Sequence, residues 1–149
     1  MSDNIITPID FSDVTDEVVA KTAQLAKALD AKVWLIHAAV PEPDFVSYEV
    51  GPEYIRDSAA RRLREEHRML GQYQDNLRAD GVDVTAMMVP GQPVAKILQE
   101  AQRLEADWIV LGSHGHGALH NLLAGSVCQG VVKKATCPVV IIPSNPDQG

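Results

Sequence analysis

Residues 4–40 read NIITPIDFSDVTDEVVAKTAQLAKALDAKVWLIHAAV, and this pattern indicates how the rest of the chain is built. The short run Asn4–Ile9 is apolar and rich in β-branched residues, which predicts a strand. The next apolar residues recur at helical spacing, namely Val14, Val18, Leu25 and Leu29. Lys32–Val40 is apolar on both faces, as is typical of a strand buried in a parallel sheet. The stretch therefore predicts a strand–helix–strand unit.

The same alternation continues to the end of the chain. Further helices are predicted over about Glu53–Asp80, Val94–Leu104 and about Ser126–Ala135. The first of these has Leu63, Leu70 and Leu77 on one apolar face, and Gly81 follows it as a C-terminal signal. Further strands are predicted at Val82–Val89, Asp107–Leu111 and Val139–Ile142. Alternating helices and apolar strands are typical of the α/β class, with helices on both faces of a parallel sheet. We expect an open, doubly wound, five-stranded sheet of Rossmann-like order 3-2-1-4-5.

Length and composition are those of a single domain. The chain has 149 residues, of which 46% are hydrophobic and 22% charged. We expect one domain over residues 1–143, followed by a polar tail at 144–149. Thirteen basic and twenty acidic residues give a net charge of −7, so neither nucleic acid nor an anionic membrane is an expected partner. Two cysteines make no disulfide framework, and residues 1–13 do not resemble a signal peptide, so we expect a cytoplasmic protein.

Residues 111–135, LGSHGHGALHNLLAGSVCQGVVKKA, lead from a buried strand into a helix. Doubly wound folds bind phosphate at such a junction. Gly112 and Gly115 let the main chain approach a ligand closely, although glycines here also fit a purely structural tight turn. Ser126 and Gln129 fit a capping box, which would leave the first amides of the helix available to an anion. The chain has neither the P-loop motif nor the dinucleotide fingerprint after its first strand.

The spacing of Gly112, Gly115, Gly125 and Ser126 resembles the G-2x-G-9x-G-[ST] signature of the universal stress protein family, in its ATP-binding branch. The resemblance extends over essentially the whole chain. It includes IITPIDFSD with Asp10 at the strand end, VWLIHAAV with its central histidine, MMVPGQPVAKIL, and ATCPVVIIP near the end. One departure is His116–Gly117–Ala118, in a loop whose composition varies in the family.

This resemblance implies a binding site for ATP, ADP or AMP, with Mg²⁺ carried by the nucleotide and no metal held by the protein alone. Asp10 would accept hydrogen bonds from the ribose hydroxyls, since a carboxylate is purely an acceptor. The adenine would be framed by Pro8, Ile9 and Ala38. The phosphates would be held by Gly112, Gly115, Gly125, Ser126 and Val127. His114 and His116 would donate to phosphate oxygens or lie beside the Mg²⁺, and no catalytic residue is expected.

The function implied is a cytoplasmic stress-response protein that signals through its bound nucleotide to an unknown protein partner. The alternative is a slow Mg²⁺-dependent ATPase, although residues 111–125 contain no arginine to stabilise a transferring phosphoryl group. A flavin-binding or phosphoryl-receiver module of similar fold is a third class. Family members that this chain resembles dimerise through the last strand. We therefore expect a homodimer through its edge residues, Val139, Val140, Ile141 and Ile142.

Several of these residues also have a purely structural interpretation. Asp10 could cap the helix that starts near Asp13. His37, inside a buried strand, is interpreted as a core histidine with satisfied hydrogen bonds. The arginine-rich segment Arg56–Arg68 is interpreted as a solvated helix face, with a docking surface as the alternative. A zinc site built from His114, His116 and His120 and a redox role for Cys128 and Cys137 are further, less favoured alternatives.

Overall fold

The computed structural model describes residues 2–39, 52–113 and 126–143. The helices are α1 (Thr15–Leu29), α2 (Pro52–Ala79), α3 (Pro93–Arg103) and α4 (Ser126–Lys134). The strands are β1 (Asn4–Pro8), β2 (Lys32–Ala39), β3 (Asp83–Pro90), β4 (Trp108–Gly112) and β5 (Val139–Ile142). Every element that the sequence predicts is present, and the boundaries agree to within a residue or two.

The strands form one five-stranded sheet in the order β3-β2-β1-β4-β5. Every neighbouring pair is parallel, with Ile5 opposite Val33 of β2 and Trp108 of β4. The expected α/β fold, an open parallel sheet of order 3-2-1-4-5, is therefore confirmed. Because β1 lies at the centre, its side chains are enclosed on both faces, and Ile5 and Ile6 are fully buried.

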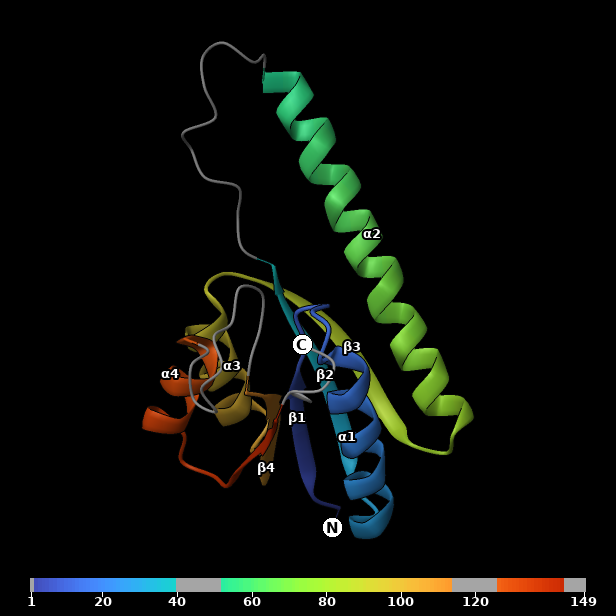
Figure 1. Ribbon diagram of the computed structural model, residues 1–149, viewed down its shortest axis with the longest axis vertical. Helices are drawn as coiled ribbons and strands as arrows, with labels where there is room; N and C mark the ends of the chain where they lie inside the picture. Colours follow the sequence, from blue (N-terminus) through green and yellow to red (C-terminus); the bar gives the residue numbers. More distant parts are fainter. Residues whose placement is uncertain (1, 40–51, 114–125, 144–149) are drawn as a thin grey trace.

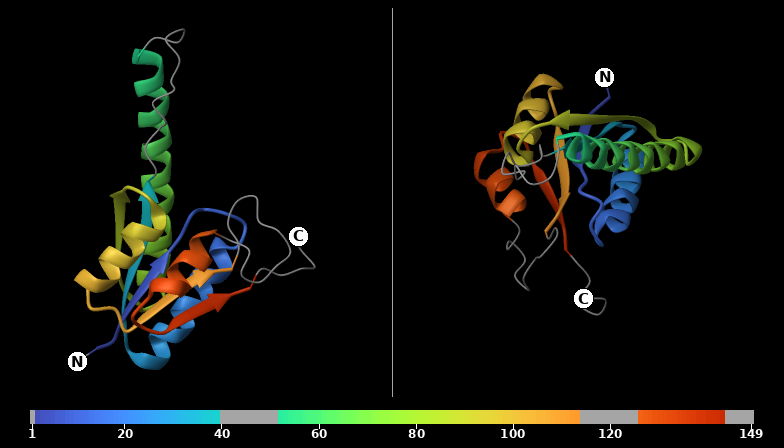
Figure 2. Two further views of the ribbon diagram at one scale, coloured as in Figure 1. Left: turned by 90° about the vertical axis from the view of Figure 1, so that its left-hand side faces the viewer. Right: turned by 90° about the horizontal axis from the view of Figure 1, so that it is seen from above.

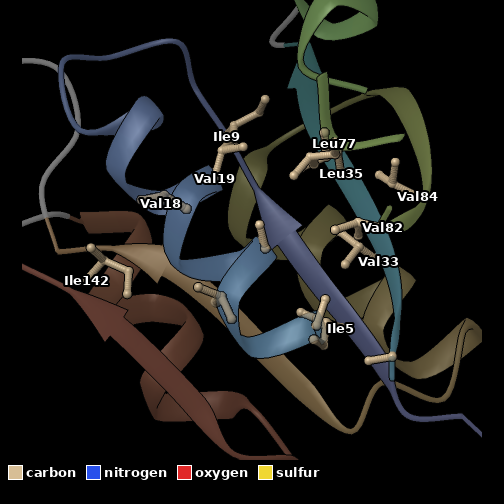
Figure 3. Close-up of a cluster of buried hydrophobic side chains, with 14 of the residues drawn as sticks. Ile5, Ile9, Val18, Val19, Val33, Leu35, Leu77, Val82, Val84 and Ile142 are labelled. Carbon is tan, nitrogen blue, oxygen red and sulfur yellow. The ribbon is translucent and has the colours of Figure 1, made fainter. Parts of the chain in front are cut away.

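Helices α1 and α2 lie on one face of the sheet, and α3 and α4 lie on the other (Figures 1 and 2). A hydrophobic layer separates each pair of helices from the sheet. Successive side chains of a strand point to opposite faces, so Ile5 packs toward α1 and α2 while Ile6 packs toward α3 and α4. Figure 3 shows the first layer, where Val18 and Val19 of α1 pack against the sheet. Burial of this kind contributes about 25 cal/mol per Å² of apolar surface and is the main stabilising term of the fold.

The predicted apolar faces of α1 and α2 need correction. In α1 the buried side chains are small or β-branched, including Val18, Ala23 and Ala26, whereas Leu29 is exposed. In α2, Leu70 and Leu77 are buried as predicted, but Leu63 is 39% exposed. Figure 1 gives the reason, because the N-terminal half of α2 extends beyond the sheet and has no strand beneath it.

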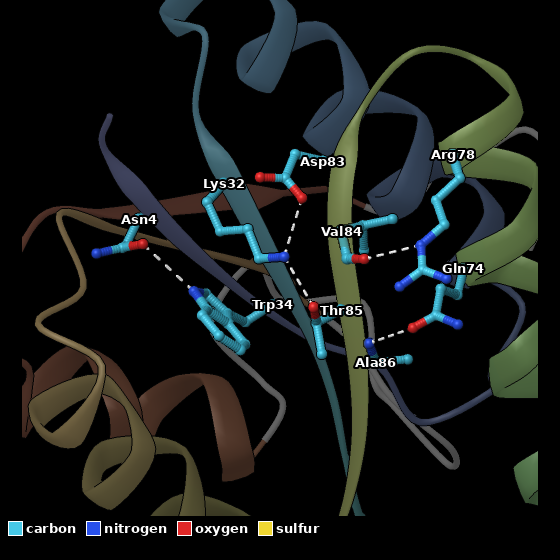
Figure 4. A network of polar contacts seen from close by, with 9 residues as sticks. All are labelled: Asn4, Lys32, Trp34, Gln74, Arg78, Asp83, Val84, Thr85 and Ala86. Atoms are coloured by element: carbon cyan, nitrogen blue, oxygen red, sulfur yellow. Dashed lines mark hydrogen bonds and ion pairs between the residues drawn. The ribbon is translucent and has the colours of Figure 1, made fainter. Parts of the chain in front are cut away.

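Polar contacts close the amino end of the sheet (Figure 4). Lys32 of β2 donates to Asp83 and Thr85 of β3 at 3.0 and 2.7 Å. On the central strand, Asn4 accepts a hydrogen bond from the Trp34 indole at 3.3 Å. These side chains satisfy one another's hydrogen bonds at the amino end of the sheet. In open α/β sheets, ligands bind at the opposite, carboxyl end.

Within the described parts of the chain, none of the helices combines the length and the apolar character that crossing a membrane requires.

Candidate functional site at the carboxyl end of the sheet

The neighbouring parallel strands β1 and β4 end at the same, carboxyl end of the sheet, at Pro8 and Gly112. Helix α4, which begins at Ser126, connects β4 to β5 and therefore starts from the same end. The connection after β1 leads to β2 on one side, and the connection after β4 leads to β5 on the other. The strand order therefore reverses between β1 and β4. In open α/β sheets this reversal opens a crevice between the two departing connections, which is the usual ligand site.

Asp10 lies exposed just beyond the end of β1. Its Oδ1 accepts a hydrogen bond from the Ser12 amide at 3.0 Å, which makes a local turn. Helix α1 begins later, at Thr15, and its N-cap residue Val14 makes no side-chain capping bond. The interpretation of Asp10 as a helix cap is therefore wrong. Its second carboxylate oxygen, Oδ2, remains at the carboxyl end of the sheet, next to the predicted ligand position.

The same turn holds two buried hydroxyl groups, Ser12 Oγ and Thr15 Oγ1. Neither has a hydrogen-bond partner among residues 2–39, 52–113 and 126–143. Buried polar atoms are rarely left unsatisfied, because an unmet hydrogen bond costs about 1–3 kcal/mol. The turn between β1 and α1 therefore has hydrogen-bonding capacity that the described chain does not use.

The residues expected to frame an adenine lie on β1 and β2, near their ends. Pro8 and Ala38 are half-buried, and Ile9 is 6% exposed. The Ile9 amide donates to the Ile36 carbonyl at 2.9 Å, while the Gly91 amide donates to Ala39 at 3.1 Å. Peptide groups alternate in direction along a strand, so Ala38, like Ile36, turns its main-chain polar groups toward β1. Ala38 therefore presents them just past the last bond between β1 and β2.

The expected phosphate-binding residues are described only in part. Gly112 is the last residue of β4, and the Ser113 amide donates to the Ile142 carbonyl at 2.9 Å, which fixes the start of the glycine-rich loop. Ser126 is exposed at the first position of α4, and Val127 is half-buried against the second hydrophobic layer. The capping box with Gln129 stays a prediction. His114, Gly115, His116, His120 and Gly125 lie outside the described residues.

A buried polar cluster that sequence reasoning did not assemble lies directly behind Ile9. His37 is 7% exposed, and its Nδ1 lies 2.9 Å from the Ile9 carbonyl oxygen. Its Nε2 contacts Oε2 of Glu66 from α2. The Phe11 ring packs on the imidazole, with ring centroids 4.6 Å apart. The interpretation of His37 as a core histidine with satisfied hydrogen bonds is therefore confirmed.

Phe11 and Tyr73 extend this cluster toward α1. Phe11 adopts a left-handed backbone with φ of 61°, which turns its ring inward against His37 and Tyr73. The Tyr73 hydroxyl donates to Asp16 at 2.6 Å. Burial, with the hydrogen bond and charge of Asp16, raises the pKa of Tyr73 to about 12, so this hydroxyl stays protonated at neutral pH. Phe11 and Tyr73 were not singled out from the sequence as site residues, because their contacts join residues that lie far apart in the sequence.

The two cysteines are structural. Cys128 is buried and Cys137 is half-buried in the second hydrophobic layer. Burial raises the pKa of both thiols, and the charge of Asp107 raises that of Cys137 further, which disfavours the reactive thiolate. Among the residues that the structure describes, no group of three histidine, cysteine or acidic side chains is placed to hold a metal ion. The three histidines of the zinc alternative lie outside that set.

This sheet order, which reverses between β1 and β4, defines the class of doubly wound α/β proteins. Residues 1–143 match the family model "Universal stress protein family", and the chain belongs to that family. Universal stress protein MJ0531 of Methanocaldococcus jannaschii is 31% identical over 144 residues, which cover 93% of this chain and 80% of that protein. The resemblance to this family is therefore confirmed, whereas the ATP-binding branch inferred from the glycine signature stays a prediction.

Solved structures agree with this assignment. The structure of MJ0577, whose function was assigned from its structure, matches with a TM-score of 0.81 and 26% identity, covering 97% of this chain and 98% of that one. A universal stress protein family protein of Arabidopsis thaliana, solved with AMP bound, matches with a TM-score of 0.71 and 23% identity over 98% of this chain and 94% of that one. Other matching structures of the family hold cAMP or dAMP.

Proposed function

We propose that this protein binds an adenine nucleotide, ATP with Mg²⁺ in the first instance, at the carboxyl end of its sheet and uses that occupancy as a signal. The observation that carries the proposal is the reversal of the strand order between β1, which exposed Asp10 follows, and β4, which ends at Gly112. The adenine nucleotides in related structures support the same ligand class.

The residues present at this edge fit the parts of a nucleotide. Asp10 is an exposed carboxylate with an oxygen to spare, which suits a ribose hydroxyl. The half-buried side chains of Pro8 and Ala38 suit one edge of an adenine ring, as do the main-chain polar groups that Ala38 turns toward β1 beyond the last bond between β1 and β2. The positive end of the α4 dipole at Ser126 suits a phosphate. The remaining glycines of the signature, Gly115 and Gly125, would complete this phosphate site.

The charge balance argues for a cation with the nucleotide. Asp10 and Asp13 are both exposed in the turn after β1, and the chain as a whole carries a net charge of −7. A triphosphate next to these carboxylates would be repelled unless Mg²⁺ or a protonated histidine of the loop offsets its charge. The proposal therefore includes Mg²⁺ as part of the bound ligand, and His114 and His116 as its neighbours.

The test is isothermal calorimetry of nucleotide-stripped protein with Mg-ATP, comparing Asp10→Asn with the parent. The asparagine keeps the acceptor oxygen for the Ser12 amide but loses the charge, so the turn should survive while ribose binding weakens. A hydrogen bond to a charged group is worth about 1.5–3 kcal/mol, so the dissociation constant should rise by about tenfold to a hundredfold. Asp13→Asn is the matched control, since it removes the same charge from an exposed position of the same turn but no ribose contact, so it should leave the affinity unchanged or slightly higher.

Two results would contradict this assignment. Equal affinities of Asp10→Asn, Asp13→Asn and the parent would remove Asp10 from the site. An absence of heat for ATP, ADP and AMP with the parent would remove the function itself. The same sample, incubated with Mg-ATP, also separates signalling from slow hydrolysis: intact ATP after hours supports a binding module, whereas steady phosphate release supports the ATPase alternative.

We also infer a homodimer through β5, Val139–Ile142. β5 is an edge strand of the sheet, and three of its four side chains are only half-buried. An apolar edge of this kind presents unpaired main-chain groups that a second copy can pair with. A signalling role supports such an arrangement, because it would place two nucleotide sites in one particle.

A further inference from the structure

The pair formed by His37 and Glu66 connects helix α2 to the candidate site through a single imidazole ring. Nδ1 of the ring lies 2.9 Å from the carbonyl oxygen of Ile9, a residue assigned to the adenine edge. Nε2 contacts the Glu66 carboxylate on α2. Helix α2 and the end of β1 are therefore joined by two hydrogen bonds that share one side chain.

Counting protons shows that this arrangement needs one more than a neutral histidine and an ionised glutamate provide. The Ile9 carbonyl and the carboxylate oxygens are acceptors, so both ring nitrogens face an acceptor. A neutral imidazole carries one N–H and can satisfy one of the two. The second contact needs an added proton, carried by the ring as imidazolium or by Glu66 as a carboxylic acid. When that proton leaves, one of the two hydrogen bonds must break.

Three neighbours of the pair within the described residues show what else faces it. From α2, Arg62 Nε lies 3.3 Å from Glu66 Oε1, so it pairs with the carboxylate oxygen that does not contact His37. Tyr73, also from α2, reaches the cluster through Phe11 and donates to Asp16 of α1, and it stays protonated far above neutral pH. On β3 the register partner of His37 is the uncharged Met88.

We propose that His37 and Glu66 form a proton-dependent link between helix α2 and the main chain of Ile9, which makes nucleotide binding weaken as pH rises. The nucleotide part rests on the function proposed above. His37 acts here as a positioning residue, because it contacts the main chain that would frame the adenine. Loss of the extra proton breaks one of the two hydrogen bonds of the folded state, whereas the unfolded chain has neither of these bonds to lose. The free energy of unfolding should therefore fall as pH rises through the range in which this proton leaves.

Glu66→Gln is the informative variant, because its amide can donate to Nε2 while Nδ1–H of a neutral ring still donates to Ile9. The link should then persist without the extra proton. Glu65→Gln is the matched control, since Glu65 is the preceding residue of α2 but is exposed and pairs with Arg68. Urea unfolding without nucleotide should be measured for all three proteins from about pH 6 to about pH 9.

Over the pH range in which the shared proton leaves, the unfolding constants of the parent and of Glu65→Gln should rise relative to that of Glu66→Gln. The rise should be up to about tenfold per pH unit. The dissociation constants of these two proteins for Mg-ATP should rise at least about fivefold over the same pH range, while that of Glu66→Gln stays level. Parallel pH profiles of the parent and Glu66→Gln in unfolding would overturn the link. A nucleotide affinity of the parent that is level with pH would overturn its effect on the site.

The unfolding measurements test the link, and the Mg-ATP titrations test its effect on the proposed function. A parent that binds no adenine nucleotide at any pH refutes the proposed function and the coupling to it, and the unfolding profiles still decide the link by themselves. If Glu66→Gln does not fold, the ¹⁵N resonances of the His37 ring in the parent give the answer. They should change in one step as the shared proton leaves. A ring that stays in one neutral tautomer from about pH 6 upward would overturn the link.

Discussion

At the scale of single residues, Gly130 of α4 shows how closely α3 and α4 pack. A Cβ built at Gly130 would lie 2.8 Å from Cγ2 and 3.0 Å from Cγ1 of Val94, a stiff β-branched side chain. Alanine is favoured over glycine in a helix by about 1 kcal/mol, but overpacking of this kind costs about 1–3 kcal/mol. We expect Gly130→Ala to lower the free energy of unfolding by about 1 kcal/mol in urea titrations.

Gly71 of α2 is the matched control. A Cβ at that position meets nothing within 4 Å, so Gly71→Ala should gain the helix preference alone and stabilise the protein by about 0.5–1 kcal/mol. Adding Val94→Ala to Gly130→Ala should relieve the clash, so the two substitutions should be less destabilising together than their sum. Stabilisation by Gly130→Ala as large as that by Gly71→Ala would contradict the close packing of the two helices.

The sequence was sufficient to predict the state of individual residues but not their long-range partners. His37 was predicted to be a buried, satisfied histidine, and it is. Glu66 was assigned to a solvated helix face, yet its carboxylate contacts His37. The rotation of α2 about its own axis decides which polar residue faces the sheet, and sequence periodicity does not give that rotation. Phe11 was not singled out, since a left-handed backbone at a non-glycine residue has no reliable sequence signal.

At the scale of elements, the two edges of the sheet are treated differently. At the β3 edge, Arg78 Nε of α2 donates to the Val84 carbonyl at 3.1 Å (Figure 4). The Gln74 side chain accepts from the Ala86 amide at 2.7 Å. Side chains of α2 thus engage the main-chain groups that β3 turns outward, which protects that edge from pairing. Pairing with a second copy is therefore expected at β5.

A proline on β5 tests this expectation. Pro138 and Ile142 turn their carbonyls toward β4, where Ile109 and Ser113 donate to them, so the peptide groups of Ile141 face outward. Ile141→Pro removes an outward amide and should convert the dimer to a monomer in sedimentation equilibrium. Ile141→Ala loses similar packing but keeps the amide, so it should remain dimeric. A monomeric parent, or a dimeric proline variant, would refute pairing through β5.

Element boundaries were predictable because their signals are local. Apolar runs and turn residues fixed each strand, and the glycine at position 81, with φ of 87°, follows α2 as the predicted C-terminal signal. The buried face of α2 was only half predictable. Periodicity assigned Leu63 to the core, but it does not show how far a helix extends beyond the sheet on which it packs.

At the scale of the whole molecule, the alternation of elements and the family resemblance were enough to predict the sheet order, while the place of the site stays a prediction. The right hand of each crossover leaves few ways to arrange parallel strands, so local patterns acquire a global consequence. Asp10, Ala38, Gly112 and Ser126 come from distant parts of the sequence and reach one end of the sheet for this reason. The link from α2 to Ile9 was not predictable, because it depends on a contact between two elements.

The most direct test of the nucleotide site is a map of amide chemical shifts in ¹⁵N-labelled, nucleotide-stripped protein as Mg-ATP is added. The largest changes should fall on Ile9, Asp10, Ala38, Gly112 and Val127, at the carboxyl end of the sheet. Asn4, Lys32 and Asp83, at the amino end, should hardly move. Changes centred on the amino end, or unchanged spectra at saturating Mg-ATP, would contradict the account.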